Sequence, residues 1–486
     1  MPVVKDDKSV NDTTEKLIKI LSSQSSIFEV QQGLFYRTDP FELCDEHKIP
    51  SCFGNNYGGV YFSCAMEPAP GQLVPNFVEI APGKCLSFRM GFNEAIIITG
   101  KTPPSVKYFS YCAFLNTRAS KKESEAAKYF KVTPTRNVPT KLSRKAISRD
   151  ILFSSLCEPI NNLKINTPGT PNGALGCSYD QPFLIVFTGS LELQQQIYKA
   201  ALQAGYSSDS LNTEVIPKDI VNFGVTTHET DTFSILNRIS GENLDDPEME
   251  KYLADPGISV FRVTANTITG PALPVPYLTP RGTGKTEMPY AKAVDELREK
   301  IIEFYSKEYD AVDIPTDVWL QESYTTFLQG ANDMGESRDT VYLGSGTFKL
   351  PEDAFIVTYG ANHAKTGKCT YSNTVVYGKN YDNGVVSVNN IEFEGSASVY
   401  LDDPVAAYLY AWRFGYYSDP SDYYTEIPSS PLYYEESIGN RHTQTIDPNE
   451  DIFLGFRAYL EPITKVGPSS NELILDRVLV FMKKVK

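Results

Sequence analysis

Short apolar runs bounded by Gly, Pro and Asn dominate the first 290 residues, and this pattern predicts β-strands. Two runs, at 94–100 and 106–114, flank a turn containing Pro103 and Pro104, so we expect a pair of buried strands there. The run at 183–188 predicts another. Over 191–204 the apolar residues recur at helical spacing and Gly205 supplies a stop, which predicts a helix.

The clearest helical pattern in the chain covers residues 290–309. Val294, Leu297, Ile301 and Phe304 form one apolar stripe, and charged residues fill most of the remaining positions. We interpret this helix as a connector between two halves. The predicted organisation is an N-terminal extension (1–26), a first β-rich domain with helices (27–289), the connector (290–310) and a second β-rich domain (311–486).

The second half repeats the first in outline. Segment 352–358 matches 93–99, and 368–377 matches 107–114. Next, 397–401 matches 183–188 and 404–414 matches 191–204, and finally 453–459 matches 258–263. The last match places Arg457 opposite Arg262. Matches in the same order indicate a repeat. We therefore expect a β-rich α+β fold with two tandem, sandwich-like sheet domains that are related by duplication and joined by a long helix.

The string EAIIITGKTPPSVKYFSY at 94–111 resembles the central hairpin of an uncharacterised family of bacterial β-rich domains. In that hairpin an acidic-Ala-apolar strand leads through a Gly and Pro turn into a Tyr-aromatic-Ser strand. The resemblance is confined to this hairpin. It implies a β-rich fold and no established activity.

Charge and hydropathy narrow the set of partners. The chain has 486 residues, and its 45 basic and 60 acidic side chains give a net charge of −15, which argues against binding to nucleic-acid phosphates. No apolar stretch is long enough to span a membrane, and the N-terminus has no apolar signal region. We expect a cytoplasmic protein with no membrane or nucleic-acid partner; a secreted mature form that has lost its signal is the alternative.

No cofactor motif stands out. The spacing of Cys44, His47, Cys52 and Cys64 matches no common zinc module. The string PRGTGKTE at 280–287 lacks the second Gly of a phosphate loop. We therefore predict no cofactor, with a divalent metal at His228, Asp231 and His363 as the weaker alternative.

Polar side chains are concentrated on the turn at 359–368, which joins two predicted strands. It carries Tyr359, Asn362, His363 and Lys365 within ten residues. A histidine on such a turn acts as a general base, binds metal or lies at the surface. We predict that His363 or His228 moves protons and that Tyr359 and Asn362 position the substrate.

Two other loops carry candidate residues. His228 and Asp231 precede a segment, 233–238, that we interpret as a short helix, with Asp231 either at the site or capping that helix. Arg281 and Lys285 precede the helix at 290–309 and could hold a carboxylate or phosphate. The competing interpretation is a rigid linker in which Arg281 forms a salt bridge.

These loops lead us to expect an enzyme that acts on a small polar or anionic carbonyl-bearing metabolite at a pocket between the halves. The reaction would be acid–base chemistry of the lyase, isomerase or hydrolase type. The predicted catalytic residues are His363, His228, Tyr359 and Asn362. The residues predicted to bind the substrate are Arg281, Lys285, Asp231 and Lys365. The alternative is a non-catalytic glycan-binding or self-assembling protein. It would use the Tyr-rich stretch at 416–434, which could also form a homo-oligomer interface.

Overall fold

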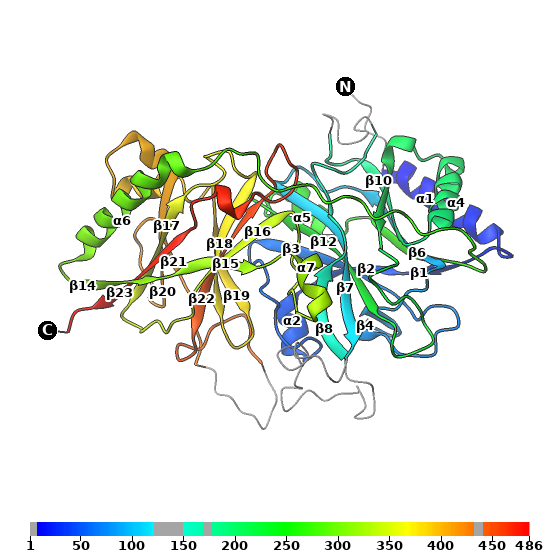
Figure 1. Cartoon of the computed structure of the whole chain (residues 1–486), viewed down its shortest axis with the longest axis horizontal. Helices are drawn as coiled ribbons and strands as arrows, with labels where there is room; N and C mark the ends of the chain where they lie inside the picture. Colours follow the sequence, from blue (N-terminus) through cyan, green and yellow to red (C-terminus); the bar gives the residue numbers. More distant parts are fainter. Residues whose placement is uncertain (1–6, 121–148, 169–176, 432–440, 486) are drawn as a thin grey trace.

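The computed structural model describes residues 7–120, 149–168, 177–431 and 441–485. The chain is a β-rich α+β protein, as predicted, and its main body is built from four sheets. The first half of the chain forms two of them and the second half forms the other two, so that the sheets lie in a row with helices at both ends (Figure 1).

The first half contains an outer and an inner sheet. The outer sheet has the order β1 (Phe28–Gln32), β13 (Ser259–Ala265), β6 (Glu94–Lys101), β10 (Pro182–Thr188), β11 (Leu211–Val215). The inner sheet has the order β2 (Leu34–Thr38), β3 (Gly59–Ala65), β12 (Thr232–Ser240), β7 (Tyr108–Ala119), β8 (Arg149–Ser155), and β9 (Ile160–Asn161) also pairs with β7. A separate hairpin is formed by β4 (Phe77–Ala81) and β5 (Lys84–Ser87).

The second half has the same arrangement. Its outer sheet has the order β14 (Tyr309–Ile314), β23 (Arg477–Lys483), β17 (Phe355–Ala361), β20 (Leu409–Gly415), β21 (Tyr424–Glu426). Its inner sheet has the order β15 (Thr316–Leu320), β16 (Thr340–Ser345), β22 (Ile452–Tyr459), β18 (Tyr371–Gly378), β19 (Asn383–Asn389). In both halves the last pair of the outer sheet is parallel (β10 with β11, β20 with β21) and the neighbouring pairs are antiparallel.

Each half encloses a core between its outer and inner sheets. In the first half Phe62, Ile98 and Ile235 belong to one buried cluster, although they come from β3, β6 and β12. In the second half Ile356 of β17 and Val376 of β18 share a cluster in the same way. Because side chains alternate along a strand, every second residue of an inner strand points away from this core, toward the other half.

Helices cover the outer sheets. Helices α1 (Asp7–Ser23) and α4 (Leu191–Ala204) pack on the first-half outer sheet, and α6 (Ala291–Tyr305) packs on that of the second half. Among the described residues, the remaining α-helices are α2 (Pro40–Asp45), α5 (Pro247–Ala254) and α7 (Ser323–Thr326). The 3₁₀ turns are η2 (Ser208–Ser210), η3 (Met288–Tyr290), η4 (Phe327–Gln329), η5 (Ser396–Val399), η6 (Pro404–Tyr408) and η7 (Ser470–Glu472).

Both strongly periodic helices were predicted correctly. Helix α4 begins after Ser190, whose hydroxyl accepts the Leu193 N–H, and it ends at Gly205, which has a φ of 107°. Helix α6 buries Val294, Leu297 and Ile301 against β17 and β23, so it belongs with the second half and not only with a linker. It precedes β14 just as α1 precedes β1.

Three local predictions were wrong. The segment 233–238, predicted as a short helix, is part of strand β12, because Phe233, Ile235 and Ile239 alternate into the first-half core. The stretch 404–414, which was matched to helix α4, forms η6 and then β20. The preceding stretch, 397–401, was matched to a strand but falls largely in the 3₁₀ turn η5.

The pairing of Arg457 with Arg262 was also wrong. Arg457 lies on β22, next to Tyr342 of β16, whereas Arg262 lies on β13 of an outer sheet. The residue with the same place in the strand order is Arg238 of β12, next to Tyr61 of β3. Apolar strands resemble one another in sequence, so the order of pairing decides which of them correspond.

The two inner sheets face each other, and polar and aromatic side chains fill the space between them. The rings of Tyr108 and Tyr459 have centroids 4.6 Å apart. The amide of Asn373 donates to Asn56 over 2.6 Å, and the Tyr108 hydroxyl donates to Asp339 over 3.2 Å. The halves therefore share an extensive polar interface. Within the described residues, no helix combines the length and apolar character needed to cross a membrane.

Candidate functional site

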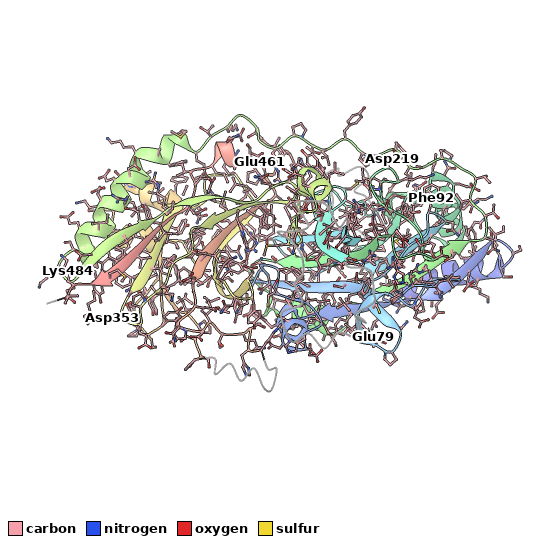
Figure 2. All side chains as sticks on the ribbon, turned by 60° about the horizontal axis from the view of Figure 1, so that its bottom comes forward. Glu79, Phe92, Asp219, Asp353, Glu461 and Lys484 are labelled. Carbon is pink, nitrogen blue, oxygen red and sulfur yellow. The ribbon has the colours of Figure 1, made fainter. Side chains whose placement is uncertain are left out.

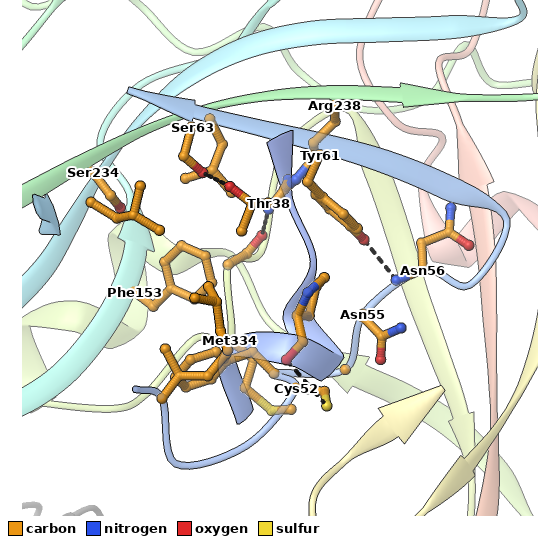
Figure 3. Close-up of a pocket in the computed structure, with 18 of the residues that line it drawn as sticks. Thr38, Cys52, Asn55, Asn56, Tyr61, Ser63, Phe153, Ser234, Arg238 and Met334 are labelled. Carbon is orange, nitrogen blue, oxygen red and sulfur yellow. Dashed lines mark hydrogen bonds between the residues drawn. The ribbon is translucent and has the colours of Figure 1, made fainter. Parts of the chain in front are cut away.

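A cavity of about 120 Å³ lies against the outward face of the first-half inner sheet, where it meets the second half. We call it the inter-half cavity. Alternate residues of β12 (Ser234, Leu236, Arg238 and Ser240) line it from the first half, and Tyr342, Arg457 and Tyr459 line it from the second. Figure 3 shows Ser234 and Phe153 on one side of this cavity and Asn55 and Asn56 on the other. The full lining is Thr38, Pro40, Leu43, Ile49, Cys52, Phe53, Gly54, Asn55, Asn56, Tyr61, Ser63, Val78, Leu86, Ser87, Asn116, Phe153, Ser234, Leu236, Arg238, Ser240, Leu320, Met334, Gly335, Tyr342, Arg457 and Tyr459.

Two arginines supply positive charge to this cavity. Arg457 is 4% exposed, and its guanidinium donates to the Gly54 carbonyl and the Tyr377 hydroxyl. Arg238 is partly buried, donates to the Gly335 carbonyl and lies over the Phe114 ring at 5.0 Å. Tyr61 and Tyr342 lie within electrostatic reach of both guanidinium groups. The cavity therefore brings two cations from different halves close to the same tyrosines.

Neither arginine forms an ion pair with any residue that the structure describes. Arg262 shows the usual arrangement, since it is fully buried and pairs with Glu94 at 2.7 Å. A buried charge without a partner is costly in free energy. The inter-half cavity thus carries an excess of positive charge that the fold itself does not neutralise.

The backbone around the cavity is strained. Eleven non-glycine residues have positive φ in the described chain, and four of these line the cavity: Phe53 (51°), Val78 (60°), Phe153 (40°) and Met334 (52°). A positive φ is a clear outlier for bulky or β-branched residues and costs roughly 1–3 kcal/mol each. Strain of this kind is concentrated at functional sites, so it points to the same place as the arginines.

The turn that holds His363 forms a separate buried cluster. His363 is 3% exposed, its Nδ1 lies 2.8 Å from a Glu287 oxygen, and its Nε2 lies 3.3 Å from Asp476. Burial alone would lower the pKa of His363, but the two carboxylates outweigh it and raise the pKa well above its usual value. The same contact with His363 outweighs burial at Glu287 and lowers the pKa of that carboxyl. Both ring nitrogens are thus engaged by carboxylates.

The other predicted residues of this turn also have structural contacts. Tyr359 is fully buried in the cluster beneath α6, and burial raises its pKa to about 12. The amide of Asn362 donates to the Asn390 carbonyl over 2.8 Å. Lys365 lies at the surface and pairs with Glu394 at 2.9 Å. Neighbouring Lys368, which was not predicted, bridges Glu461 and Glu472 at 2.5 Å each.

The loop at 279–287 meets this turn. Lys368 donates to the Lys285 carbonyl, and Glu472 accepts the N–H groups of Thr283 and Gly284. Arg281 forms an ion pair with Glu322. A salt bridge of Arg281 is what the rigid-linker interpretation expected. The Lys285 side chain is exposed.

His228 and Asp231 lie elsewhere. Asp231 is fully buried and receives two hydrogen bonds from Arg118, at 3.0 and 2.6 Å, and it leads into strand β12, so it caps no helix. Ser240, at the other end of β12, lies at the interface, where both it and Tyr459 bond Asn56. Figure 2 shows the separation: Asp219, from the loop before His228, lies over the first half, and Glu461, which binds Lys368, lies near the junction.

None of the eight predicted site residues lines the inter-half cavity. The loops at 279–287 and 359–368 come together, but His228 does not join them. The Tyr-rich stretch falls partly on residues 432–440, outside the described chain. Of its described members, Tyr417 and Tyr424 stack on each other and Tyr423 packs on Trp412, and all are half-buried.

Sequence reasoning missed Arg238 and Arg457 as site residues. A usable signal was present in 233–240, where apolar Phe233, Ile235 and Ile239 alternate with Ser234 and Arg238. Read as a strand, that pattern places Arg238 on the outward face. Arg457 lies on a strand of another sheet, so the alternation within a single strand could not show that it lines the same cavity as Arg238.

Comparisons with known proteins identify no family. No family model matches the chain, and no curated protein matches it. One similar solved structure is an uncharacterised protein from Burkholderia cenocepacia, with 11% identity and a TM-score of 0.37 over 97% of this chain and 88% of that chain. No group of three or more His, Cys, Asp or Glu side chains suited to metal binding occurs among the described residues.

Proposed function

We propose that the protein binds a small organic anion in the inter-half cavity, with Arg238 and Arg457 as its cationic contacts. The observation that carries the proposal is that buried Arg457 and partly buried Arg238, one from each half, line one cavity without a carboxylate partner in the described chain. A bound carboxylate or phosphate would neutralise them through charge-assisted hydrogen bonds.

The repeated strand order supports a binding site at this position. We infer that the two sheet pairs derive from one duplicated unit and that the cavity lies where the two units meet. Four lining positions correspond between the units: Thr38 with Leu320, Tyr61 with Tyr342, Arg238 with Arg457, and Ser240 with Tyr459. Ligand sites occur preferentially at such junctions between domains.

Binding is favoured over the predicted acid–base catalysis. The described lining contains no His, Asp, Glu or Lys, so it lacks the usual general bases. His363 is occupied by Glu287 and Asp476 and lies outside the cavity. An enzyme at this site would have to use Tyr or Cys52 for proton transfer, which the geometry does not single out.

Calorimetric titration of the intact protein tests the proposal. The panel is acetate, succinate, inorganic phosphate, benzoate and, as a neutral control, benzamide. We expect at least one anion to bind and Arg238→Met to weaken it by roughly tenfold or more, because a charge-assisted hydrogen bond is lost. Arg477→Met is the matched control, since Arg477 is a half-buried arginine on β23 that pairs with Asp295 and lies outside the cavity lining.

A filling substitution provides a second, independent check. Ser234 is 4% exposed and points into the cavity, so Ser234→Leu should block binding while leaving both arginines in place. Circular dichroism and unfolding by urea establish that each variant is folded. The proposal is overturned if no anion of the panel binds, or if binding survives in both Arg238→Met and Ser234→Leu.

A further inference from the structure

The apolar part of the inter-half cavity points to a more specific ligand. We propose that the ligand is a compact aromatic monocarboxylate, whose carboxylate meets the arginines and whose ring lies among the apolar side chains. This inference rests on the proposed function. It adds the chemical class, which comes from the shape and composition of the rest of the lining.

The four strained residues supply that apolar wall. Phe53 and Phe153 meet edge to face with ring centroids 5.3 Å apart, and Phe153 also packs against Phe114 at 5.1 Å. Met334 and Val78 complete the strained set. Aromatic edges and faces and a thioether sulfur interact favourably with an aromatic ring. Left-handed backbone holds these side chains in place, so a specific apolar surface has been kept at a cost in strain.

The cationic and apolar parts of the cavity are close together. The Arg238 guanidinium lies 5.0 Å from the centroid of the Phe114 ring, and Phe114 packs against Phe153 with ring centroids 5.1 Å apart. Figure 3 shows Phe153 and Met334 on the Ser234 side and Tyr61 on the side of Asn55 and Asn56. A molecule that reaches from the arginines to Phe153 is therefore short.

The size of the cavity sets the same limit. Its volume is about 120 Å³. An engineered apolar cavity of roughly 150 Å³ in another protein takes up benzene, so the space here suits one ring with a small substituent. A long acyl chain or a nucleotide would not fit. An inorganic ion would leave the apolar wall without a partner.

The charge of the lining favours one acidic group. Both arginines lie near Tyr61 and Tyr342, and the described lining contains no other cation. Both cations are within reach of one carboxylate, so a second carboxylate on the ligand would find no further cation in the described lining and would lose its hydration without compensation. Dicarboxylates should therefore bind more weakly than benzoate.

Competition between matched ligands tests this inference on the intact protein. Benzoate and phenylacetate are compared by calorimetry with four other ligands. Benzamide lacks the charge, and acetate lacks the ring. Cyclohexanecarboxylate lacks the aromatic face, and succinate has two charges. We expect benzoate or phenylacetate to bind roughly tenfold or more tightly than each of the others, because each lacks one of the matched features.

Variants separate the two parts of the ligand. Arg238→Met should reduce the difference between benzoate and benzamide. Met334→Gln should reduce the difference between benzoate and acetate, because it places an amide in the apolar wall while keeping the length of the side chain. Arg477→Met should change neither.

The outcomes distinguish this inference from the proposed function. Tighter binding of succinate, acetate or phosphate, lost in Arg238→Met, overturns the aromatic ligand and leaves the anion site standing. Equal binding of benzoate and cyclohexanecarboxylate also overturns it. Absence of binding by every anion overturns both.

Discussion

Arg238 and Arg457 occupy the same register position in the two inner sheets, each directly across from a tyrosine on the neighbouring strand. Arg238 lies opposite Tyr61, and Arg457 lies opposite Tyr342. The two sheets face each other, so equivalent residues from distant parts of the sequence line one cavity. The site depends on how the halves are placed and is absent from either half alone.

Arg238→Met is expected to increase the stability of the unliganded protein by about 1 kcal/mol. The substitution removes an unpaired, partly buried charge and one hydrogen bond to Gly335, and methionine can fill much of the space. The matched variant is Arg262→Met, which leaves Glu94 buried without its partner and should cost about 3–5 kcal/mol. Urea unfolding measures both. A loss of more than about 2 kcal/mol in Arg238→Met would indicate a structural role for Arg238.

His363→Gln is expected to destabilise the protein by about 3–5 kcal/mol. The side chain holds the carboxylates of Glu287 and Asp476 together in a buried cluster, and without it both lose their cation. His228→Gln serves as the control and should change stability by less than about 0.5 kcal/mol, because the His228 side chain lies in a surface loop. Equal, small effects of the two substitutions would contradict the structural role of the His363 cluster.

The sequence predicts the elements far better than it predicts the site. Strands with buried faces on both sides, such as β6, and the amphipathic helices α4 and α6 have patterns that short-range physics explains. Strand β12 was misread because Phe233–Arg238 mixes apolar and polar residues over too short a stretch to separate a period of 2 from one of 3.6. The alternation is clear only when Ile239 and Ser240 are included.

The candidate site was out of reach for a different reason. Dense polar loops drew attention to His363, yet the structure uses those groups to hold a turn against the loop at 279–287. Arg238 and Arg457 are 219 positions apart in the numbering of the chain. Only the packing of one sheet on another brings them together, and no spacing along the chain encodes it.

Asn56→Ala is expected to cost about 2–4 kcal/mol by weakening the interface between the halves. The Asn56 amide donates to Ser240 at 3.2 Å and to Tyr459 at 3.0 Å, and its oxygen accepts from Asn373 at 2.6 Å. Alanine leaves these buried groups without partners. Asn449→Ala is the control, because Asn449 is exposed and its side chain bonds only Asp447 in its own loop. Urea unfolding of both variants measures the difference, and equal midpoints would refute the role assigned to Asn56.

Stability is expected to fall as the pH rises from about 5.5 to about 8. Burial raises the pKa of Glu336 to about 7 and that of Asp333 and Asp339 to about 6. The folded protein therefore keeps protons that the unfolded chain has released, and this advantage is lost as the pH rises through those values. His363 acts in the same direction, since its raised pKa contributes stability below the usual histidine pKa that is lost at higher pH.

Glu336→Gln isolates one source of this pH dependence. The carboxyl accepts the Ser323 N–H and hydroxyl, and a neutral amide can replace the protonated acid there. We expect the free energy of unfolding of the variant to fall by about 2 kcal/mol less than that of the native protein over that pH range, given the size of the shift. Exposed Glu352→Gln should keep the native slope. Free energies of unfolding in urea at several pH values provide the measurement, and an unchanged slope in Glu336→Gln would assign the effect to the other buried groups.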